Sequence, residues 1–146
     1  MPNHASILLI DDSPGECELF RQALAQARLD ITLYTEHDAE AALHFLANRA
    51  AHESPPSVIL LDWQLEKTRG DQFLTRLRSH GRFVSIPVVV FTTSDVSSDM
   101  TASYASGANS YVVKPGTFDE LVQCVGVMCR FWTNWNVTPC PVKTQC

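Results

Sequence analysis

Three features that mark other classes of protein are missing from this sequence of 146 residues. No unbroken apolar stretch approaches the ~20 residues that a membrane-spanning helix needs. Residues 1–4 lack the basic start and the apolar stretch of a secretion signal, so we expect a cytoplasmic protein. Lysine and arginine form no cluster and the formal net charge is −5, which argues against nucleic acid or an anionic membrane as a direct partner.

Cysteines at metal-binding or redox spacing are missing as well. The five cysteines are an odd number and include no C-x-x-C pair, so reduced thiols are expected. Cys140 and Cys146 lie in a proline-containing tail, and a metal or redox role stays open for these two residues alone.

The overall composition is that of one globular domain. Apolar residues make up 45% of the chain and charged residues 18%, and the length suffices to bury a proper core. We expect this domain to occupy residues 1–135 and a loose tail to occupy residues 136–146.

Buried strands and helices alternate strictly along this domain. Apolar and β-branched runs predict strands at residues 6–10, 31–34, 58–61, 87–91 and 110–113. Helical spacing of apolar residues predicts helices at residues 14–28, 39–50, 70–80, 97–105 and 118–135. Such alternation with short connections favours right-handed crossovers, and therefore an α/β fold in which a doubly wound, five-stranded parallel sheet lies between two layers of helices.

Three of these helices begin with a recognisable N-cap. Ser13 precedes Glu16 by three residues and Thr117 precedes Glu120 by three, which is the capping-box pattern. Asp38 is the predicted cap of the second helix.

Polar side chains follow four of the five predicted strands directly. Asp11 and Asp12 come after the first strand, Asp62 after the third, Thr92 after the fourth and Lys114 after the fifth. Because the carboxyl ends of parallel strands meet at one edge of the sheet, these side chains should converge. Three crowded carboxylates need a positive charge between them, and a hard cation such as Mg²⁺ suits an open cluster of oxygen ligands. Lys114 and Thr92 would suit a phosphoryl group placed beside the metal.

This ordered set of residues resembles the receiver domain of two-component response regulators, over residues 6 to about 132. The match consists of Asp11-Asp12, Asp62 with Gly70 eight residues later, Thr92 thirty residues after Asp62, and Lys114-Pro115 a further twenty-two residues along. The resemblance implies a flavodoxin-like three-layer α/β/α sandwich with strand order 2-1-3-4-5.

The same resemblance implies a role for each matching residue. Asp62 would be the phosphoacceptor, and Mg²⁺ would be held by Asp11, Asp12, Asp62 and the backbone carbonyl of Gln64. Lys114 would pair with the acyl phosphate, Thr92 would bond a phosphoryl oxygen, and Tyr111 would be the aromatic switch residue. The implied protein is a single-domain regulator that accepts a phosphoryl group from a histidine kinase and then switches its protein–protein interactions. It would not be an enzyme beyond its own phosphotransfer and autodephosphorylation.

More narrowly, the chain resembles the stand-alone response regulators that pair with bacterial phytochromes. This likeness lies in Thr92-Thr93-Ser94, in the segment 108–111 and in Phe131-Trp132 at the end of the last helix. The sensor kinase would then be a phytochrome. The Trp63-Gln64 pair is less usual for the family, which leaves the rate of phosphate loss open.

Two other functions are alternatives to a phosphorylated receiver. An aspartyl-phosphate phosphatase of the haloacid-dehalogenase type also uses an Asp at a strand end, but usually has a second acid two residues later, where this chain has Gln64. A receiver that interacts without being phosphorylated is the other alternative, and the intact acidic set argues against it.

The last predicted helix has more apolar surface than one sheet can cover. One stripe, which would dock on the sheet, consists of Phe118, Leu121, Val122, Val125, Met128, Cys129 and Trp132. A second stripe consists of Cys124, Val127, Phe131 and Trp135. An exposed apolar stripe marks a protein interface, so we expect a homodimer through the fifth helix and the fifth strand. A helix end wrapped by residues 137–146 is the alternative.

Overall fold

The computed structural model of this protein describes residues 5–49 and 53–139, and strands and helices alternate throughout these ranges. The five strands are β1 (Ser6–Ile10), β2 (Thr32–Glu36), β3 (Val58–Leu61), β4 (Val88–Thr92) and β5 (Ser110–Val113). The helices are α1 (Pro14–Gln26), α2 (Ala39–Asn48), α3 (Gly70–Arg78), α4 (Ser97–Ala105), α5 (Phe118–Arg130) and a π-helical turn, η1 (Phe131–Trp135). Cys140 and Cys146 lie outside the described residues, as does Ala50 at the predicted end of the second helix.

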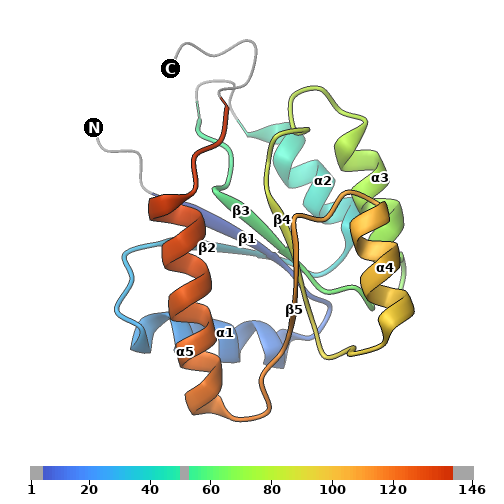
Figure 1. Ribbon diagram of the computed structural model, residues 1–146. Coiled ribbons are helices and arrows are strands. Elements are labelled where there is room, and N and C mark those ends of the chain that lie inside the picture. The colour runs from blue at the N-terminus through green and yellow to red at the C-terminus, as the bar shows by residue number, and fades with distance from the viewer. Residues whose placement is uncertain (1–4, 50–52, 140–146) are drawn as a thin grey trace.

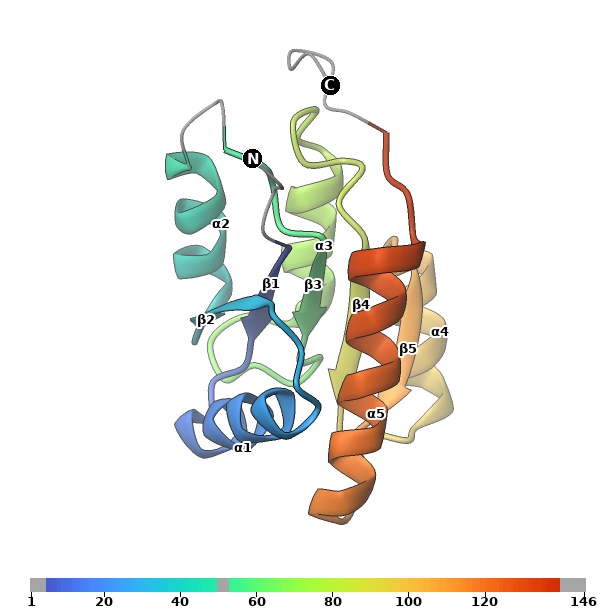
Figure 2. The ribbon, with the colours of Figure 1, turned by 90° about the vertical axis from the view of Figure 1, so that its left-hand side faces the viewer.

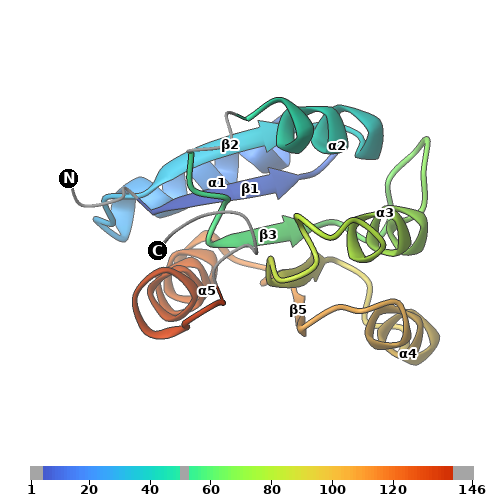
Figure 3. The ribbon, with the colours of Figure 1, turned by 90° about the horizontal axis from the view of Figure 1, so that it is seen from above.

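The strands form one parallel sheet in the order β2-β1-β3-β4-β5, which confirms the predicted fold and strand order. The arrowheads of β1, β2 and β3 point in one direction in Figure 3. The three central strands are buried at every position, because each lies between two layers of helices. All five strands therefore deliver their carboxyl ends to the same edge.

Two hydrophobic clusters fill the space on either side of the sheet. Alternate strand residues, such as Leu8 and Leu61, pack with α2 and α3 in one cluster. Their neighbours, such as Leu9 and Leu60, pack with α1 and α5 in the other. Figures 1 and 2 show α1 and α5 on one side of the sheet and α2, α3 and α4 on the other. Among helices within the described residues, none combines the length and apolar character needed to cross a bilayer.

The predicted N-caps are confirmed. The side chains of Ser13, Asp38 and Thr117 accept hydrogen bonds from backbone N–H groups three residues later, at 3.2, 2.7 and 3.2 Å. These bonds fix the residues at which α1, α2 and α5 begin. Helices α1 and α5 begin beside the edge that carries the polar residues.

Helix ends differ from the prediction where the backbone leaves helical geometry. The first helix ends at Gln26, not near Arg28, because Arg28 has a left-handed φ of 57°. The last helix winds more widely from Phe131 onward, where Asn136 N–H donates to the carbonyl of Phe131 at 2.8 Å. This turn keeps the chain helical to Trp135, the predicted end.

The guanidinium of Arg78 fixes the amino end of β5. It donates to the carbonyl of Gly107 at 3.0 and 3.1 Å, to the carbonyl of Ile86 at 2.7 Å and to the side-chain oxygen of Asn109 at 2.8 Å. Gly107 has a φ of 110°, which favours glycine, and a Cβ there would also lie close to Arg78 Cγ, at 3.1 Å. The start of the strand that carries Tyr111 is thereby tied to α3.

Candidate functional site

The carboxyl edge of the sheet brings together the residues that the sequence analysis placed after strands. Three of them extend the ladder of backbone hydrogen bonds by one residue beyond the strands. Asp11 N–H donates to the carbonyl of Glu36 at 3.0 Å, and Asp62 N–H donates to the carbonyl of Ile10 at 2.9 Å. Lys114 N–H donates to the carbonyl of Thr92 at 2.7 Å. Because the backbone is held there, the position of each side chain is set by the sheet.

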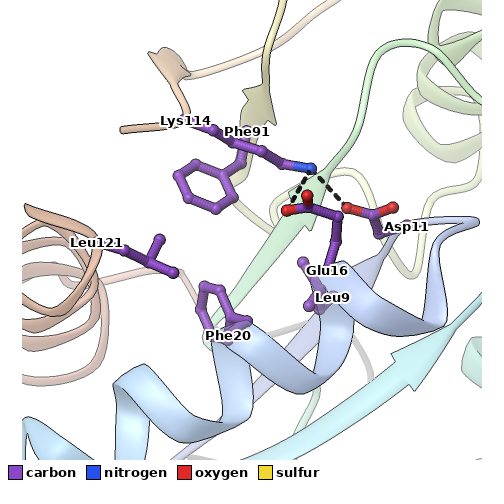
Figure 4. Close-up of a pocket in the computed structure, with 7 residues that line it drawn as sticks. All are labelled: Leu9, Asp11, Glu16, Phe20, Phe91, Lys114 and Leu121. Atoms are coloured by element: carbon purple, nitrogen blue, oxygen red, sulfur yellow. Dashed lines mark hydrogen bonds and ion pairs between the residues drawn. The ribbon is translucent and has the colours of Figure 1, made fainter. Parts of the chain in front are cut away.

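The ammonium group of Lys114 is the centre of the site. It donates to Asp11 Oδ2 at 2.7 Å and lies 3.6 Å from Asp62 Oδ2 and 3.6 Å from Glu16 Oε2. Its side chain is only 8% exposed, and Asp11 and Asp62 are 2% and 13% exposed. Figure 4 shows the ammonium meeting Asp11 and Glu16 above an apolar floor that includes Phe20 and Phe91. A single buried cation is therefore shared by three carboxylates.

Asp11, Asp12 and Asp62 form a compact acidic cluster. Each offers a carboxylate oxygen within 4.8 Å of those of the other two. Asp12 Oδ2 also accepts a hydrogen bond from Glu66 N–H at 3.0 Å, which ties the loop after β3 to the loop after β1. Three carboxylate oxygens, open to solvent on one side, are the donor set of a hard divalent cation such as Mg²⁺. The residues present fit that ion.

Burial and neighbouring charge have opposite effects on the pKa of Asp62. Burial raises its pKa above the usual value, while Lys114 and hydrogen bonds from Gln64 N–H and Thr92 oppose the rise. The Gln64 N–H bond to Asp62 Oδ1 measures 3.1 Å. For Lys114, burial would lower the pKa, but the hydrogen bond and charge of Asp11, with the charges of Asp62 and Glu16, raise it. Lys114 is therefore held in its charged form.

Thr92 and Tyr111 are joined through Ser94, in the loop between β4 and α4. Thr92 is fully buried, and its hydroxyl accepts from Ser94 N–H at 3.4 Å. The hydroxyl of Tyr111 donates to the carbonyl of Ser94 at 2.8 Å. Ser94 in turn donates its own hydroxyl to Asp99 Oδ2 at 2.6 Å, at the start of α4. Ser94 therefore links Thr92, Tyr111 and the start of α4 by hydrogen bonds.

Trp63, directly after Asp62, points away from the acidic cluster and into the core. Its ring is 4% exposed and belongs to the cluster on the side of α2 and α3. Gly70 is the first residue of α3, and a Cβ added there would lie 2.5 Å from Trp63 Cε3. Because Gly70 has no side chain, the Trp63 ring can pack against the first residue of α3. This packing anchors the chain beside Asp62.

Glu16 is the site residue that the sequence analysis did not predict. Its spacing from Ser13 predicts a capping box, in which the Glu side chain would return to the N–H of the cap. Instead, Ser13 N–H donates to Asp11 Oδ1 at 3.0 Å, and the Glu16 carboxylate lies against Lys114. The acidic residue one helical turn after Asp12 was the available signal.

The second apolar stripe of α5 is exposed over most of its length. Val127, Phe131 and Trp135 are 69%, 47% and 77% exposed. The prediction was wrong for Cys124, which is half-buried and packs against the cluster below α5. The exposed stripe consists of Val127, Phe131 and Trp135 alone.

Comparison with known proteins places the chain among receivers. The family described as response regulator receiver domain matches residues 7–126. Response regulator Rcp1 of Synechocystis is 34% identical over 135 residues, which cover 91% of this chain and 92% of that protein. The structure of its Mn²⁺-bound form has a TM-score of 0.79 at 31% identity, covering 92% of this chain and 99% of that one.

Two further solved structures come from phytochrome systems. The phosphorylated cyanobacterial phytochrome response regulator RcpA has a TM-score of 0.83 at 31% identity, covering 93% of this chain and 99% of that one. The bacteriophytochrome response regulator RtBRR has a TM-score of 0.72 at 36% identity, covering 96% of this chain and 85% of that one.

Proposed function

Because this chain belongs to the response regulator receiver domain family, we propose that Asp62 accepts a phosphoryl group from a sensor histidine kinase. Receiver domains are parts of two-component systems and are generally phosphoacceptors, not enzymes acting on a separate substrate. The observation that carries the proposal is the position of Lys114, 3.6 Å from Asp62 and hydrogen-bonded to Asp11 at the same strand edge.

Mg²⁺ is the proposed cofactor, and Asp11, Asp12, Asp62 and the backbone carbonyl of Gln64 would hold it. The donor set of three carboxylate oxygens supports this, as does the Mn²⁺-bound form of the relative Rcp1. When bound, the ion would neutralise the carboxylates and withdraw charge from the transferred phosphoryl group.

The side chains at the edge have complementary roles in the transfer. A carboxylate oxygen of Asp62 attacks phosphorus in line with the departing imidazole, so one P–O bond forms while the P–N bond of the phosphohistidine breaks. Lys114 stabilises the negative charge on the phosphoryl oxygens, because its ammonium is already held beside Asp62. The Thr92 hydroxyl would donate to a phosphoryl oxygen once the group is on Asp62.

The output of the switch would pass through the loop between β4 and α4. When Thr92 turns toward the phosphoryl group, its contact with Ser94 N–H is lost, and Ser94 is also the acceptor of the Tyr111 hydroxyl. Tyr111 would then move inward and change the surface formed by α4, β5 and α5. This surface would recognise the downstream partner.

A phytochrome is the proposed kinase. The chain is close to phytochrome response regulators, and RcpA and RtBRR are both described as such. Their likeness to this chain extends over most of both lengths.

A homodimer through α5 and β5 is the proposed assembly. Burying the exposed stripe of Val127, Phe131 and Trp135 against a second copy would remove apolar surface from water. β5 is an edge strand of the sheet, and its last residue, Val113, is 40% exposed, so the strand also offers apolar surface to a second copy.

The phosphoacceptor role is tested by labelling from a phosphorylated phytochrome kinase and from acetyl phosphate, each with Mg²⁺. We expect the parent to carry an acid-labile label and Asp62→Asn to carry none while keeping the parent's circular dichroism. Asp71→Asn is the matched control. Asp71 lies in the first turn of α3, and its carboxylate contacts Gln72 N–H and Arg69, not Lys114. Equal labelling of Asp62→Asn and parent would refute the proposal.

A further inference from the structure

Glu16 and Lys114 form an ion pair that is not part of the acidic cluster. Glu16 lies in the first turn of α1, and its Oε2 is 3.6 Å from the ammonium of Lys114 at the end of β5. Lys114 is 8% exposed while Glu16 is 44% exposed, so the carboxylate is the solvent-exposed partner of a buried cation. Figure 4 shows Glu16 and Asp11 approaching the same nitrogen.

The carboxylate of Glu16 is not needed for the helix on which it lies. The cap of α1 uses the backbone N–H of Glu16, which donates to Ser13 Oγ at 3.2 Å. Removing the side-chain charge would therefore leave this bond in place. The ion pair with Lys114 is the interaction through which a charge at Glu16 can act on the site.

The charge of Glu16 is also distinct from that of the metal-binding residues. Asp11, Asp12 and Asp62 share one cluster in which a divalent cation would offset their charges, and Glu16 is outside that cluster. Lys114 provides its positive charge to Asp11, Asp62 and Glu16 together. Phosphorylation of Asp62 would add negative charge on one side of Lys114, while Glu16 keeps its own on another.

We propose that Glu16 is a positioning residue that retains Lys114 beside α1, and that it weakens the site's affinity for an anionic phosphodonor. The proposal rests on the phosphoacceptor function of Asp62. In this arrangement Glu16 competes with the incoming phosphoryl oxygens for the ammonium and repels them. The side chain at position 16 would therefore determine how readily Asp62 is phosphorylated at a given phosphodonor concentration.

Glu16→Gln tests the proposal because it keeps the size and the cap and removes only the charge. With acetyl phosphate and Mg²⁺, we expect the half-saturating concentration for labelling to fall by about three- to tenfold, with a maximal rate changed by less than about twofold. The same variant should bind beryllofluoride more tightly, and its half-saturation should depend less on ionic strength. Glu16→Asp keeps the charge and should stay closer to the parent than Glu16→Gln.

Glu18→Gln is the matched control. Glu18 is on the same helix, is 58% exposed and pairs with Arg21 at 3.7 Å, so its substitution makes the same change in net charge without contacting Lys114. If Glu16→Gln and Glu18→Gln have equal half-saturation constants, Glu16 is only a surface ion pair and the proposal is wrong.

A second measurement decides the matter without phosphorylation. In ¹⁵N NMR spectra of the lysine ammonium groups, Glu16→Gln should shift the Lys114 signal and speed its exchange with water, whereas Glu18→Gln should not. An unchanged Lys114 signal would overturn the proposal whatever the labelling shows. Absence of labelling in the parent, with the NMR shift present, would instead refute the phosphoacceptor function and leave the ion pair established.

Discussion

Replacing Gly70 with alanine should damage the protein through Trp63. The added Cβ would lie 2.5, 3.0 and 3.1 Å from Trp63 Cε3, Cζ3 and Cδ2, whereas ordinary contacts of this kind begin near 3.4 Å. The ring would have to move by about 1 Å, and it is 4% exposed among buried side chains. The substitution therefore acts as overpacking of the core.

The expected magnitude follows from two opposing contributions. Overpacking of a well-filled core costs about 1–3 kcal/mol. Alanine at a helical position gains up to about 1 kcal/mol over glycine, and less at the first position of a helix. We expect a net loss of about 1–2 kcal/mol in the free energy of unfolding, or a melting temperature lower by about 3–6 °C.

Urea unfolding followed by circular dichroism measures this loss, with Gly15→Ala as the control. Gly15 is also at the start of a helix, but a Cβ there would meet only Ser13 Oγ at 3.8 Å, so alanine should be neutral or stabilising. In a Trp63→Leu background, Gly70→Ala should cost much less, because the ring that obstructs the methyl group is gone. Equal effects of Gly70→Ala and Gly15→Ala would refute the reasoning.

Three further predictions concern the cation, a buried thiol and the assembly. Asp12→Ala should weaken Mg²⁺ binding at least about tenfold in calorimetry, whereas Asp71→Ala should not, and equal affinities would exclude the cluster. Burial raises the pKa of Cys129 to about 12 from 9.0, so unfolding releases protons above pH 9. The contribution of this thiol to the free energy of unfolding should then be constant below pH 9 and fall by ~1.4 kcal/mol per pH unit above it. The difference in this free energy between parent and Cys129→Ala, measured at about pH 8 and again at about pH 10.5, isolates the effect. The double variant Val127→Glu, Phe131→Glu should sediment as a folded monomer, and a parent that is monomeric at high micromolar concentration, with or without beryllofluoride, would exclude the dimer.

The fold could be predicted from the sequence because each element has its own local signal. The buried strands are short apolar runs. In a strictly alternating α/β chain the strands are parallel, so the residues that follow them all lie at one edge of the sheet. Ser13, Asp38 and Thr117 fix helix starts through contacts three residues away, which a linear pattern records directly. The end of α1 was harder, since a left-handed φ at Arg28 has no marker such as glycine.

The candidate site could be predicted only as far as the sheet determines it. Asp11, Asp62 and Lys114 are placed by backbone ladder bonds, so their convergence follows from topology. The contact between Trp63 and Gly70 depends on how the Trp63 ring packs against the backbone of Gly70 across a loop, and no spacing in the sequence records such a contact. Trp63 adjoins Asp62 in the chain, yet its ring is buried on the side of α2 and α3 and does not face the acidic cluster.

Glu16 illustrates how two correct local signals can hide a long-range contact. The sequence S-P-G-E satisfies the rule for a capping box, and Ser13 does cap the helix. The reciprocal bond does not form, because Asp11 already accepts from Ser13 N–H and the Glu16 carboxylate has a stronger partner in a buried ammonium. A charge–charge contact at 3.6 Å with a side chain that is 8% exposed outweighs a solvent-exposed bond to a neutral amide. The first turn of α1 therefore contributes a charge to the site at the end of β5, and Lys114 has three carboxylates around it where the strand ends alone account for two, Asp11 and Asp62.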